Sequence, residues 1–104
     1  MIRSILTLKT DPARAEQILA LYRVEGILEE SLELTRGVAS EISVATDGSG
    51  EIMVTALWPD EAAYQEWLDH PKRERAAPKL RPLLSHAEIG VGKLFRVDHE
   101  ASAS

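Results

Sequence analysis

The chain has 104 residues, of which 44% are hydrophobic and 28% are charged, with a formal net charge of −5 at pH 7. These values are typical of one globular domain and exclude a disordered chain, a collagen-like sequence and a coiled-coil array. The acidic balance argues against nucleic acid as a partner. Cysteine is absent, which excludes disulfides, thiol nucleophiles and cysteine-ligated zinc, and asparagine is absent as well.

No segment of the sequence has the length and apolarity of a membrane-spanning helix. The longest run without Asp, Glu, Lys or Arg covers residues 52–59, whereas a span needs roughly 20 residues. The first residues lead directly into a strand-like pattern and not into the apolar core of a signal peptide. We therefore expect a cytoplasmic protein with no membrane partner.

The N-terminal third predicts a strand followed by a helical region. Residues 2–9 form a short β-branched and apolar run, which is typical of a strand. Asp11 then supplies an N-cap, and Pro12 suits the first helical position. Apolar residues keep helical spacing beyond this point, but Gly26 lies inside the region, so one bent helix or two consecutive helices fit equally well. We expect Gly37 to end the region as a left-handed cap.

The middle of the chain predicts a hairpin and a second helix. Residues 38–46 alternate as a strand does, and residues 47–50 (DGSG) tolerate the positive φ angles of a hairpin turn. The returning strand, residues 51–58, is apolar on both faces, which predicts that both faces are covered. Asp60 is the expected N-cap of a helix that ends before Pro71.

The C-terminal part is interrupted by prolines and closes with a polar tail. Because of Pro78 and Pro82, we expect residues 72–84 to form a short helical turn followed by an extended linker. Residues 87–97 have the pattern of a final strand. The small polar residues 98–104 predict a mobile tail.

The elements follow the order β-α-β-β-α-β, which predicts an α+β domain at residues 1–97 of the ferredoxin-like type with an antiparallel sheet. Right-handed crossovers place both helices on the same face of the sheet. The other face then carries apolar strand residues that nothing else in this chain covers. A domain of this size buries only about two thirds of its unfolded surface, so we expect a homodimer that packs through its sheet faces.

Residues 55–68, with the sequence TALWPDEAAYQEWL, carry the strongest resemblance to a known family. The segment is similar to a strand that ends in Trp, an acidic turn and a helix that ends near an aromatic residue or His. That succession resembles the antibiotic-biosynthesis monooxygenase superfamily of dimeric α+β barrels. The string Arg36-Gly37-Val38 before an alternating strand and the hairpin at residues 47–50 fit the same pattern, and the resemblance covers about residues 2–97.

The resemblance implies a cofactor-independent monooxygenase that acts on an aromatic, phenolic or quinol-type small molecule. Two alternatives stay open: a haem-binding or haem-degrading member of the same fold, and a non-catalytic dimer that binds a small ligand. In the haem-degrading branch, Trp67 matches the family's Trp, Ser4 falls at the Asn position, and Ala77 or Pro78 falls at the position of the iron-binding His. Neither Ala nor Pro ligates iron, so we expect no cofactor.

The candidate site residues combine this resemblance with side-chain chemistry. The catalytic candidates are Trp67, which would stack on or orient an aromatic ligand, and His70, whose imidazole would act as the base. The substrate-binding candidates are Tyr22, Tyr64, Ser4 and Trp58. Core packing of the aromatic residues and a solvent-exposed His at a helix end are the structural alternatives.

Two further patterns bear on ligands. The chain has three His, which are scattered along the sequence, so we expect no metal site. Residues 72–81 carry five Lys or Arg and one Glu. This basic segment is able to bind an anionic ligand, to pair with the acidic first helix or to be solvated, and we favour the last two.

Overall fold

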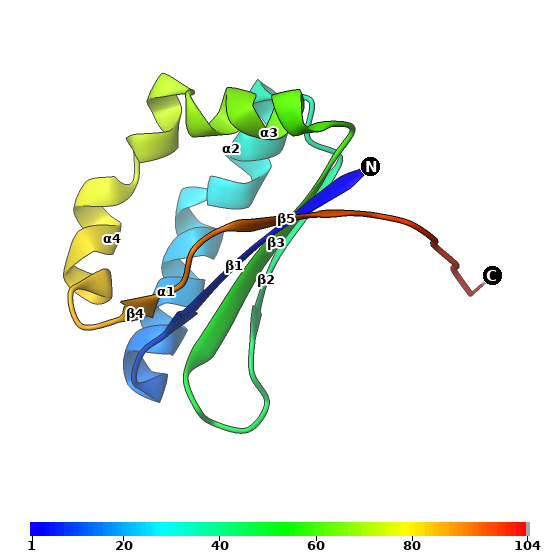
Figure 1. The fold of residues 1–104 in the computed structure, drawn as a ribbon. Helices are drawn as coiled ribbons and strands as arrows, with labels where there is room; N and C mark the ends of the chain where they lie inside the picture. Colours follow the sequence, from blue (N-terminus) through cyan, green and yellow to red (C-terminus); the bar gives the residue numbers. More distant parts are fainter. Residues whose placement is uncertain (104) are drawn as a thin grey trace.

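A computed structural model describes residues 1–103, and Ser104 lies outside the described residues. The described part contains both strands and helices (Figure 1). In chain order they are β1 (Ile2–Lys9), α1 (Pro12–Glu25), α2 (Ile27–Leu34), β2 (Ala39–Val44), β3 (Glu51–Trp58), α3 (Glu61–Leu68), the 3₁₀ helix η1 (Pro71–Glu74), α4 (Ala77–Leu84), β4 (Glu88–Ile89) and β5 (Lys93–Arg96).

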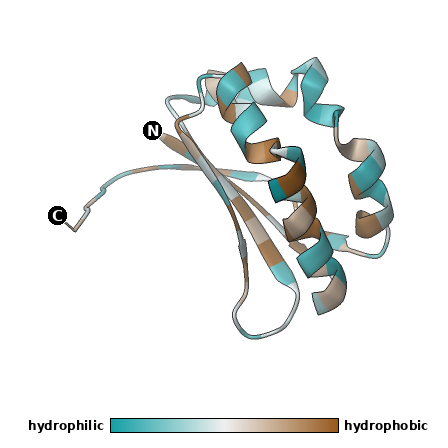
Figure 2. Cartoon of the chain, turned by 180° about the vertical axis from the view of Figure 1, so that it is seen from behind, coloured by the Kyte–Doolittle hydropathy of each residue, from teal (hydrophilic) through white to brown (hydrophobic). Residues whose placement is uncertain are grey.

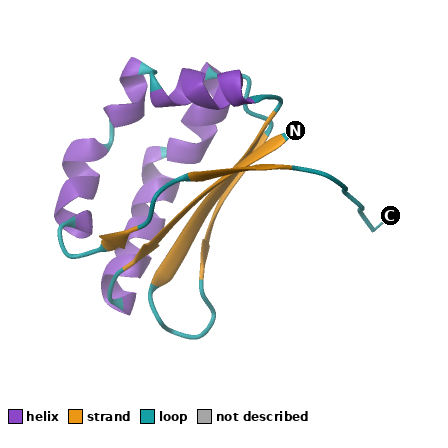
Figure 3. Cartoon of the chain, in the orientation of Figure 1, coloured by secondary structure: helices purple, strands orange, loops and turns teal. Residues whose placement is uncertain are grey.

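The sheet is antiparallel, with the strand order β2-β3-β1-β4, and β5 also pairs with β1. The register of β1 and β3 runs from Ile2 opposite Trp58 to Lys9 opposite Glu51. All helices lie on one face of this sheet, and the chain after β5 projects away from the body (Figures 1 and 3). The prediction of a ferredoxin-like α+β fold with an antiparallel sheet is confirmed.

The core lies between the sheet and the helices. Its largest fully buried side chains are Trp58, Ile18 and Ile52. Ile18 and Ile52 belong to a cluster at one end of the sheet, and Trp58 packs with Ala56 and Ala63 in a second cluster. Figure 2 shows hydrophobic residues recurring along α1 and along the central strands, which is the pattern that buries one helix stripe against one sheet face.

Two helices begin at the N-caps that the sequence predicts. The Asp11 carboxylate accepts a hydrogen bond from the Arg14 amide at 2.9 Å, and the Asp60 carboxylate accepts one from the Ala63 amide at 2.8 Å. Each bond satisfies an amide that has no partner within its own helix. The longest helix, α1, has 14 residues, and no helix among residues 1–103 is long and apolar enough to cross a bilayer.

The helical region after Asp11 consists of two helices, and its left-handed residue is Gly26 and not Gly37. Gly26 has a φ of 59° and separates α1 from α2. The second helix ends at Leu34, followed by Thr35 in extended backbone. The Thr35 hydroxyl accepts a hydrogen bond from the Gly37 amide at 3.1 Å. The predicted left-handed cap at Gly37 is therefore wrong, because a threonine side chain and an extended turn end this helix.

The predicted extended linker in residues 72–84 is also wrong, because this segment forms η1 and α4. Pro78 lies in the first turn of α4, where a missing N–H costs no hydrogen bond. Pro82 lies in the last turn of α4 and removes only one backbone hydrogen bond. Leu83 and Leu84 pack against the core cluster of Ile18 and Ile52, so apolar burial outweighs the proline there.

The predicted final strand is divided into β4 and β5 by a glycine-containing connection. The Gly90 amide donates a hydrogen bond to the Thr7 carbonyl oxygen at 2.8 Å. A Cβ added at Gly90 would lie 2.9 Å from the Thr7 hydroxyl and 3.1 Å from its carbonyl oxygen. Glycine therefore permits a close approach of this connection to β1, which interrupts the regular pairing.

The described part of the predicted tail, residues 98–103, contains no helix or strand. Its first residue, Asp98, forms an exposed ion pair with Arg96 at 3.4 Å. The mobility of the tail stays a prediction, as does the domain boundary after residue 97.

Candidate functional site

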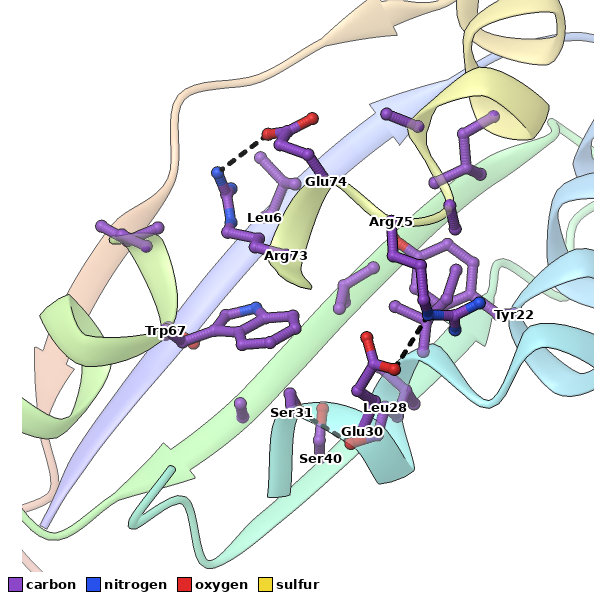
Figure 4. Close-up of a pocket in the computed structure, with 18 of the residues that line it drawn as sticks. Leu6, Tyr22, Leu28, Glu30, Ser31, Ser40, Trp67, Arg73, Glu74 and Arg75 are labelled. Atoms are coloured by element: carbon purple, nitrogen blue, oxygen red, sulfur yellow. Dashed lines mark hydrogen bonds and ion pairs between the residues drawn. The ribbon is translucent and has the colours of Figure 1, made fainter. Parts of the chain in front are cut away.

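A cavity of about 340 Å³ lies between the helices and the face of the sheet that they cover (Figure 4). Its floor comes from β1, β2 and β3, and its walls come from α1, α2, α3, η1 and α4. The sequence-predicted residues that line it are Ser4, Tyr22, Trp58, Tyr64 and Trp67. Segments from both halves of the chain therefore meet at this cavity.

Small side chains in one row across the sheet make room for the cavity. Ser4 pairs with Ala56 on one side, and Ser40 pairs with Ala56 on the other. Directly paired residues of neighbouring antiparallel strands share a face of the sheet. The neighbouring row on the same face, Leu6 and Val54, carries larger apolar side chains that also line the cavity. The floor is thus polar at its two edges and apolar between them.

Aromatic side chains stand at both ends of the cavity. The Trp67 indole of α3 points into it, and Tyr22 of α1 lies at the opposite end (Figure 4). Tyr64, one helical turn before Trp67, packs edge-to-face against Trp58, with ring centroids 5.6 Å apart and an interplanar angle of 65°. These rings offer flat apolar surfaces to a ligand.

Trp58 is both a core residue and a residue that lines the cavity. Its side chain is 2% exposed and belongs to the core, and it also lines the cavity. Its indole Nε1–H donates a hydrogen bond to the Ser4 hydroxyl oxygen at 2.9 Å. The indole of the last β3 residue therefore fixes the orientation of a side chain on β1.

An ion-pair cluster fastens the wall formed by η1 and α4 to the junction of α1 and α2. The Arg75 guanidinium donates to the Glu30 carboxylate at 2.8 Å, to the Glu25 carboxylate at 3.0 Å and to the Glu25 carbonyl oxygen at 2.6 Å. Lys79 also pairs with Glu25. Hydrogen bonds from Lys79 and then from Arg75 hold the pKa of Glu25 below its usual value. Arg75 and Lys79 therefore pair with the acidic helices, as one of the sequence interpretations predicts.

The remaining cations of the basic segment stand around the cavity. Lys72, Arg73 and Arg81 all line it. Arg73 lies 3.7 Å from the Glu74 carboxylate in an exposed pair, and Figure 4 shows this pair above the cavity. In the described part of the chain, Lys72 and Arg81 have no ion-pair partner. This rim gives the cavity a positive border.

The Tyr22 phenol stays protonated over a wider pH range than an exposed phenol. Burial raises the pKa of Tyr22 above its usual value of 10.0, and the charge of Arg73 opposes part of that rise. A buried neutral phenol keeps its O–H as a hydrogen-bond donor. At neutral pH, Tyr22 therefore faces a ligand as a neutral polar group.

His70 lies outside the residues that line the cavity. It caps η1, and its Nδ1 accepts a hydrogen bond from the Lys72 amide at 3.2 Å. Its ring centroid is 6.3 Å from that of Trp67. Because Nδ1 is an acceptor here, the proton of the neutral ring is on Nε2. The role of His70 as a base stays a prediction, and it requires the Lys72 hydrogen bond to break.

Sequence reasoning missed two serines and the wall formed by α4. Ser31 and Ser40 line the cavity beside the Trp67 indole (Figure 4). Alternation in the strand that contains Ser40 places it on the same face as Ile42, which was a usable signal. No comparable signal exists for Ser31, a serine that is 5% exposed on an otherwise amphipathic helix.

The family model of the antibiotic biosynthesis monooxygenases matches residues 1–79 of the chain. The chain belongs to this family. The matched residues include every element of the antibiotic biosynthesis monooxygenase fold from β1 to η1, and they carry all of the predicted site residues. No curated protein matches the sequence significantly.

Solved structures that resemble this family member extend the match over almost the whole chain. A candidate antibiotic biosynthesis monooxygenase from Deinococcus radiodurans is 16% identical, with a TM-score of 0.76, over 100% of this chain and 99% of the other. SnoaB, a cofactor-independent oxygenase from Streptomyces nogalater, is 19% identical, with a TM-score of 0.69, over 95% of this chain and 94% of SnoaB. A dimeric ferredoxin-like protein from an uncultured marine organism is 11% identical, with a TM-score of 0.79, over 96% and 97%. At these identities the likeness shows the shared fold.

Proposed function

We propose that this chain is a cofactor-independent monooxygenase that acts on an aromatic, phenolic or quinol-type small molecule. The observation that carries the proposal is the cavity of about 340 Å³, which has an indole at one end, a phenol at the other and small residues on its floor. Its size suits a flat molecule of a few rings. Membership of the antibiotic biosynthesis monooxygenase family supports the reaction type.

The proposed reaction needs no reductant besides the substrate. A methylene group beside a phenolic ring, R₂CH₂, reacts with O₂ to give the ketone R₂C=O and one molecule of water. One oxygen atom enters the product, and the other leaves as water. The four electrons that the methylene carbon loses are those that O₂ gains. The protein has to bind the aromatic, assist loss of its proton and stabilise the resulting anion beside O₂.

The predicted residues have complementary parts in this proposal. Trp67 stacks on the ligand and orients it, while Tyr22 and Tyr64 line the ends of the cavity. Ser4 contacts the ligand from the floor, and Trp58 holds Ser4 through its N–H. His70 is the proposed base, because its ring lies near that of Trp67. Removal of the Lys72 hydrogen bond from Nδ1 is part of that proposal.

We further propose that the chain acts as a cytoplasmic homodimer that packs through its free sheet face. Met53, Leu57 and Phe95 alternate with the residues that face the helices. Met53 is 38% exposed and Phe95 is 50% exposed, and burial of such side chains favours association. Sedimentation is expected to show a dimer at micromolar concentration, and a monomer alone would contradict this part of the proposal.

Oxygen consumption tests the proposed activity. Purified protein in buffer with a metal chelator is mixed with a panel of quinols and anthrone-type phenols in an oxygen electrode, and heat-denatured protein corrects for autoxidation. We expect faster oxygen uptake with the native protein for at least one anthrone-type phenol, with one O₂ consumed per ketone formed. Equal rates with native and denatured protein for the whole panel would contradict the proposal.

A further inference from the structure

Three serine hydroxyl groups of the cavity each use either their proton or a lone pair in a bond within the protein. What each has left determines whether it can donate to a ligand or only accept from one. Each serine hydroxyl has one proton to donate and lone pairs that accept. Where the partner is a group that can only donate or only accept, the direction of the bond follows from chemistry alone. Ser4, Ser31 and Ser40 each have such a partner.

Ser4 keeps its proton available for a ligand. Its oxygen lies 2.9 Å from the Nε1 atom of Trp58, and an indole N–H can only donate. Ser4 is therefore the acceptor in this bond. No acceptor for the Ser4 proton is present among residues 1–103, and the side chain lines the cavity. Ser4 can therefore donate a hydrogen bond to a ligand in the cavity.

Ser31 and Ser40, in contrast, can only accept a hydrogen bond from a ligand. The Ser31 oxygen lies 2.7 Å from the Leu28 carbonyl oxygen, and the Ser40 oxygen lies 3.1 Å from the Thr55 carbonyl oxygen. A carbonyl oxygen only accepts, so each serine uses its one proton in this bond. What both can still offer to a ligand are lone pairs.

The donor and the acceptors stand on opposite edges of the floor. Ser4 on β1 and Ser40 on β2 both pair with Ala56 of β3, so two strand spacings, roughly 10 Å, separate them. Ser31 belongs to α2, which packs against β2, the strand that carries Ser40, and both serines line the cavity. Between the two edges the floor is apolar, because Ala56 and the neighbouring Leu6 and Val54 form it.

We propose that the site selects an aromatic ligand with an acceptor oxygen, a carbonyl or phenolate, at one end and a hydroxyl group at the far end. This inference rests on the proposed function of the cavity. Ser4 donates to the acceptor oxygen, and Ser31 and Ser40 accept from the distant hydroxyl. Trp58 is a positioning residue that acts through Ser4. When the substrate loses its proton, the Ser4 donor stabilises negative charge on the oxygen that it binds.

Three matched naphthalenes test the donor and acceptor directions by calorimetric titration. The first, 6-acetyl-2-naphthol, has both groups. The second, 6-ethyl-2-naphthol, has a methylene group in place of the carbonyl and so lacks only the carbonyl oxygen. The third, 2-acetyl-6-methoxynaphthalene, has no hydroxyl proton. We expect the first to bind wild-type protein about fivefold more tightly than either of the others, since each loses about one hydrogen bond of roughly 1 kcal/mol. This comparison needs no variant.

Two variants assign the preferences to residues. In Ser4→Ala the preference for 6-acetyl-2-naphthol over 6-ethyl-2-naphthol is expected to disappear, while the preference over the methoxy compound persists. In the double variant Ser31→Ala, Ser40→Ala the preference over the methoxy compound is expected to disappear, while the preference that depends on the carbonyl oxygen persists. Trp58→Phe keeps the Ser4 hydroxyl but frees its rotation, so the first preference is expected to weaken. Circular dichroism of each variant confirms that it is folded.

The outcomes separate the inference from the proposed function. Equal affinity of wild type for all three probes, or preferences that Ser4→Ala leaves intact, would overturn the inference and leave the proposed aromatic cavity standing. Failure of wild type to bind any of the three would contradict the proposed function and this inference together.

Discussion

Substitution of Gly90 by alanine tests how closely the connection between β4 and β5 approaches β1. The new Cβ would lie 2.9 Å from the Thr7 hydroxyl oxygen and 3.1 Å from the Thr7 carbonyl oxygen. The hydroxyl can rotate away, but the carbonyl oxygen belongs to a paired strand and is held by the Gly90 amide at 2.8 Å. One strand therefore has to shift, and we expect a loss of about 1–3 kcal/mol in the free energy of unfolding, as for other overpacked sites.

Gly92→Ala is the matched control for Gly90→Ala. A Cβ at Gly92 meets only the Tyr64 hydroxyl at 3.3 Å, which is the far end of a side chain. We expect this variant to stay within about 0.5 kcal/mol of wild type. Urea unfolding followed by circular dichroism measures both variants, at one protomer concentration because association shifts the transition. Equal stability of the two variants would refute the close approach derived for Gly90.

Further predictions concern charge, the ends of the cavity and haem. The pKa of Glu25 is lowered in the folded state from 4.5, so its carboxylate stabilises the fold above pH 4.5 and this contribution is lost as the pH falls through the folded pKa. The stability difference between wild type and Glu25→Gln should therefore narrow in acid urea titrations, and a constant difference would contradict the ion-pair cluster. The pKa of Tyr22 is raised in the folded state from 10.0. The stability that its protonated phenol supports is therefore fully present below pH 10.0 and is lost as the pH rises through the folded pKa. Tyr22→Phe should flatten the alkaline fall in stability, and an unchanged fall would refute burial as the cause. Trp67→Ala should weaken binding of 2-naphthol roughly tenfold, given the 1–3 kcal/mol of one aromatic stack, whereas Gln65→Ala, on the exposed side of α3, should not. Haem added to the protein should leave the Soret band unshifted, because Ala77 lines the cavity without an iron ligand, and a shifted band would favour the haem-binding alternative.

Local interactions explain why much of the fold was predictable. The N-caps at Asp11 and Asp60 depend on residues three positions away, so the sequence alone indicates both helix starts. Alternation along β3 likewise places Trp58 and Ala56 on the helix-facing side. The end of α2 was not predictable in this way, because the Thr35 hydroxyl replaces the expected glycine cap at Gly37.

Tertiary contacts decide the features that the sequence could not give. Pro82 is tolerated in α4 because Leu83 and Leu84 pack against the core, a contact that no local rule contains. Pairing of the basic segment with the acidic first helix is one of the two interpretations that the sequence favours, the other being solvation. The choice of Glu25 and Glu30 as partners depends on how η1 meets α2. Ser31 joins the site for the same reason, since only the folded chain brings α2 next to β2.

Oxidation of 1,8-dihydroxyanthrone under ¹⁸O₂ in chelator-containing buffer tests the proposed oxygenase activity most directly. Mass spectrometry of the quinone product reports where its new oxygen atom comes from, and the rate is compared between wild type and Trp67→Ala. We expect one ¹⁸O atom in the new ketone, formed faster with wild type than with Trp67→Ala or with denatured protein. A rate that native wild-type protein does not raise above that of denatured protein, or a ketone oxygen drawn from water, would contradict the account.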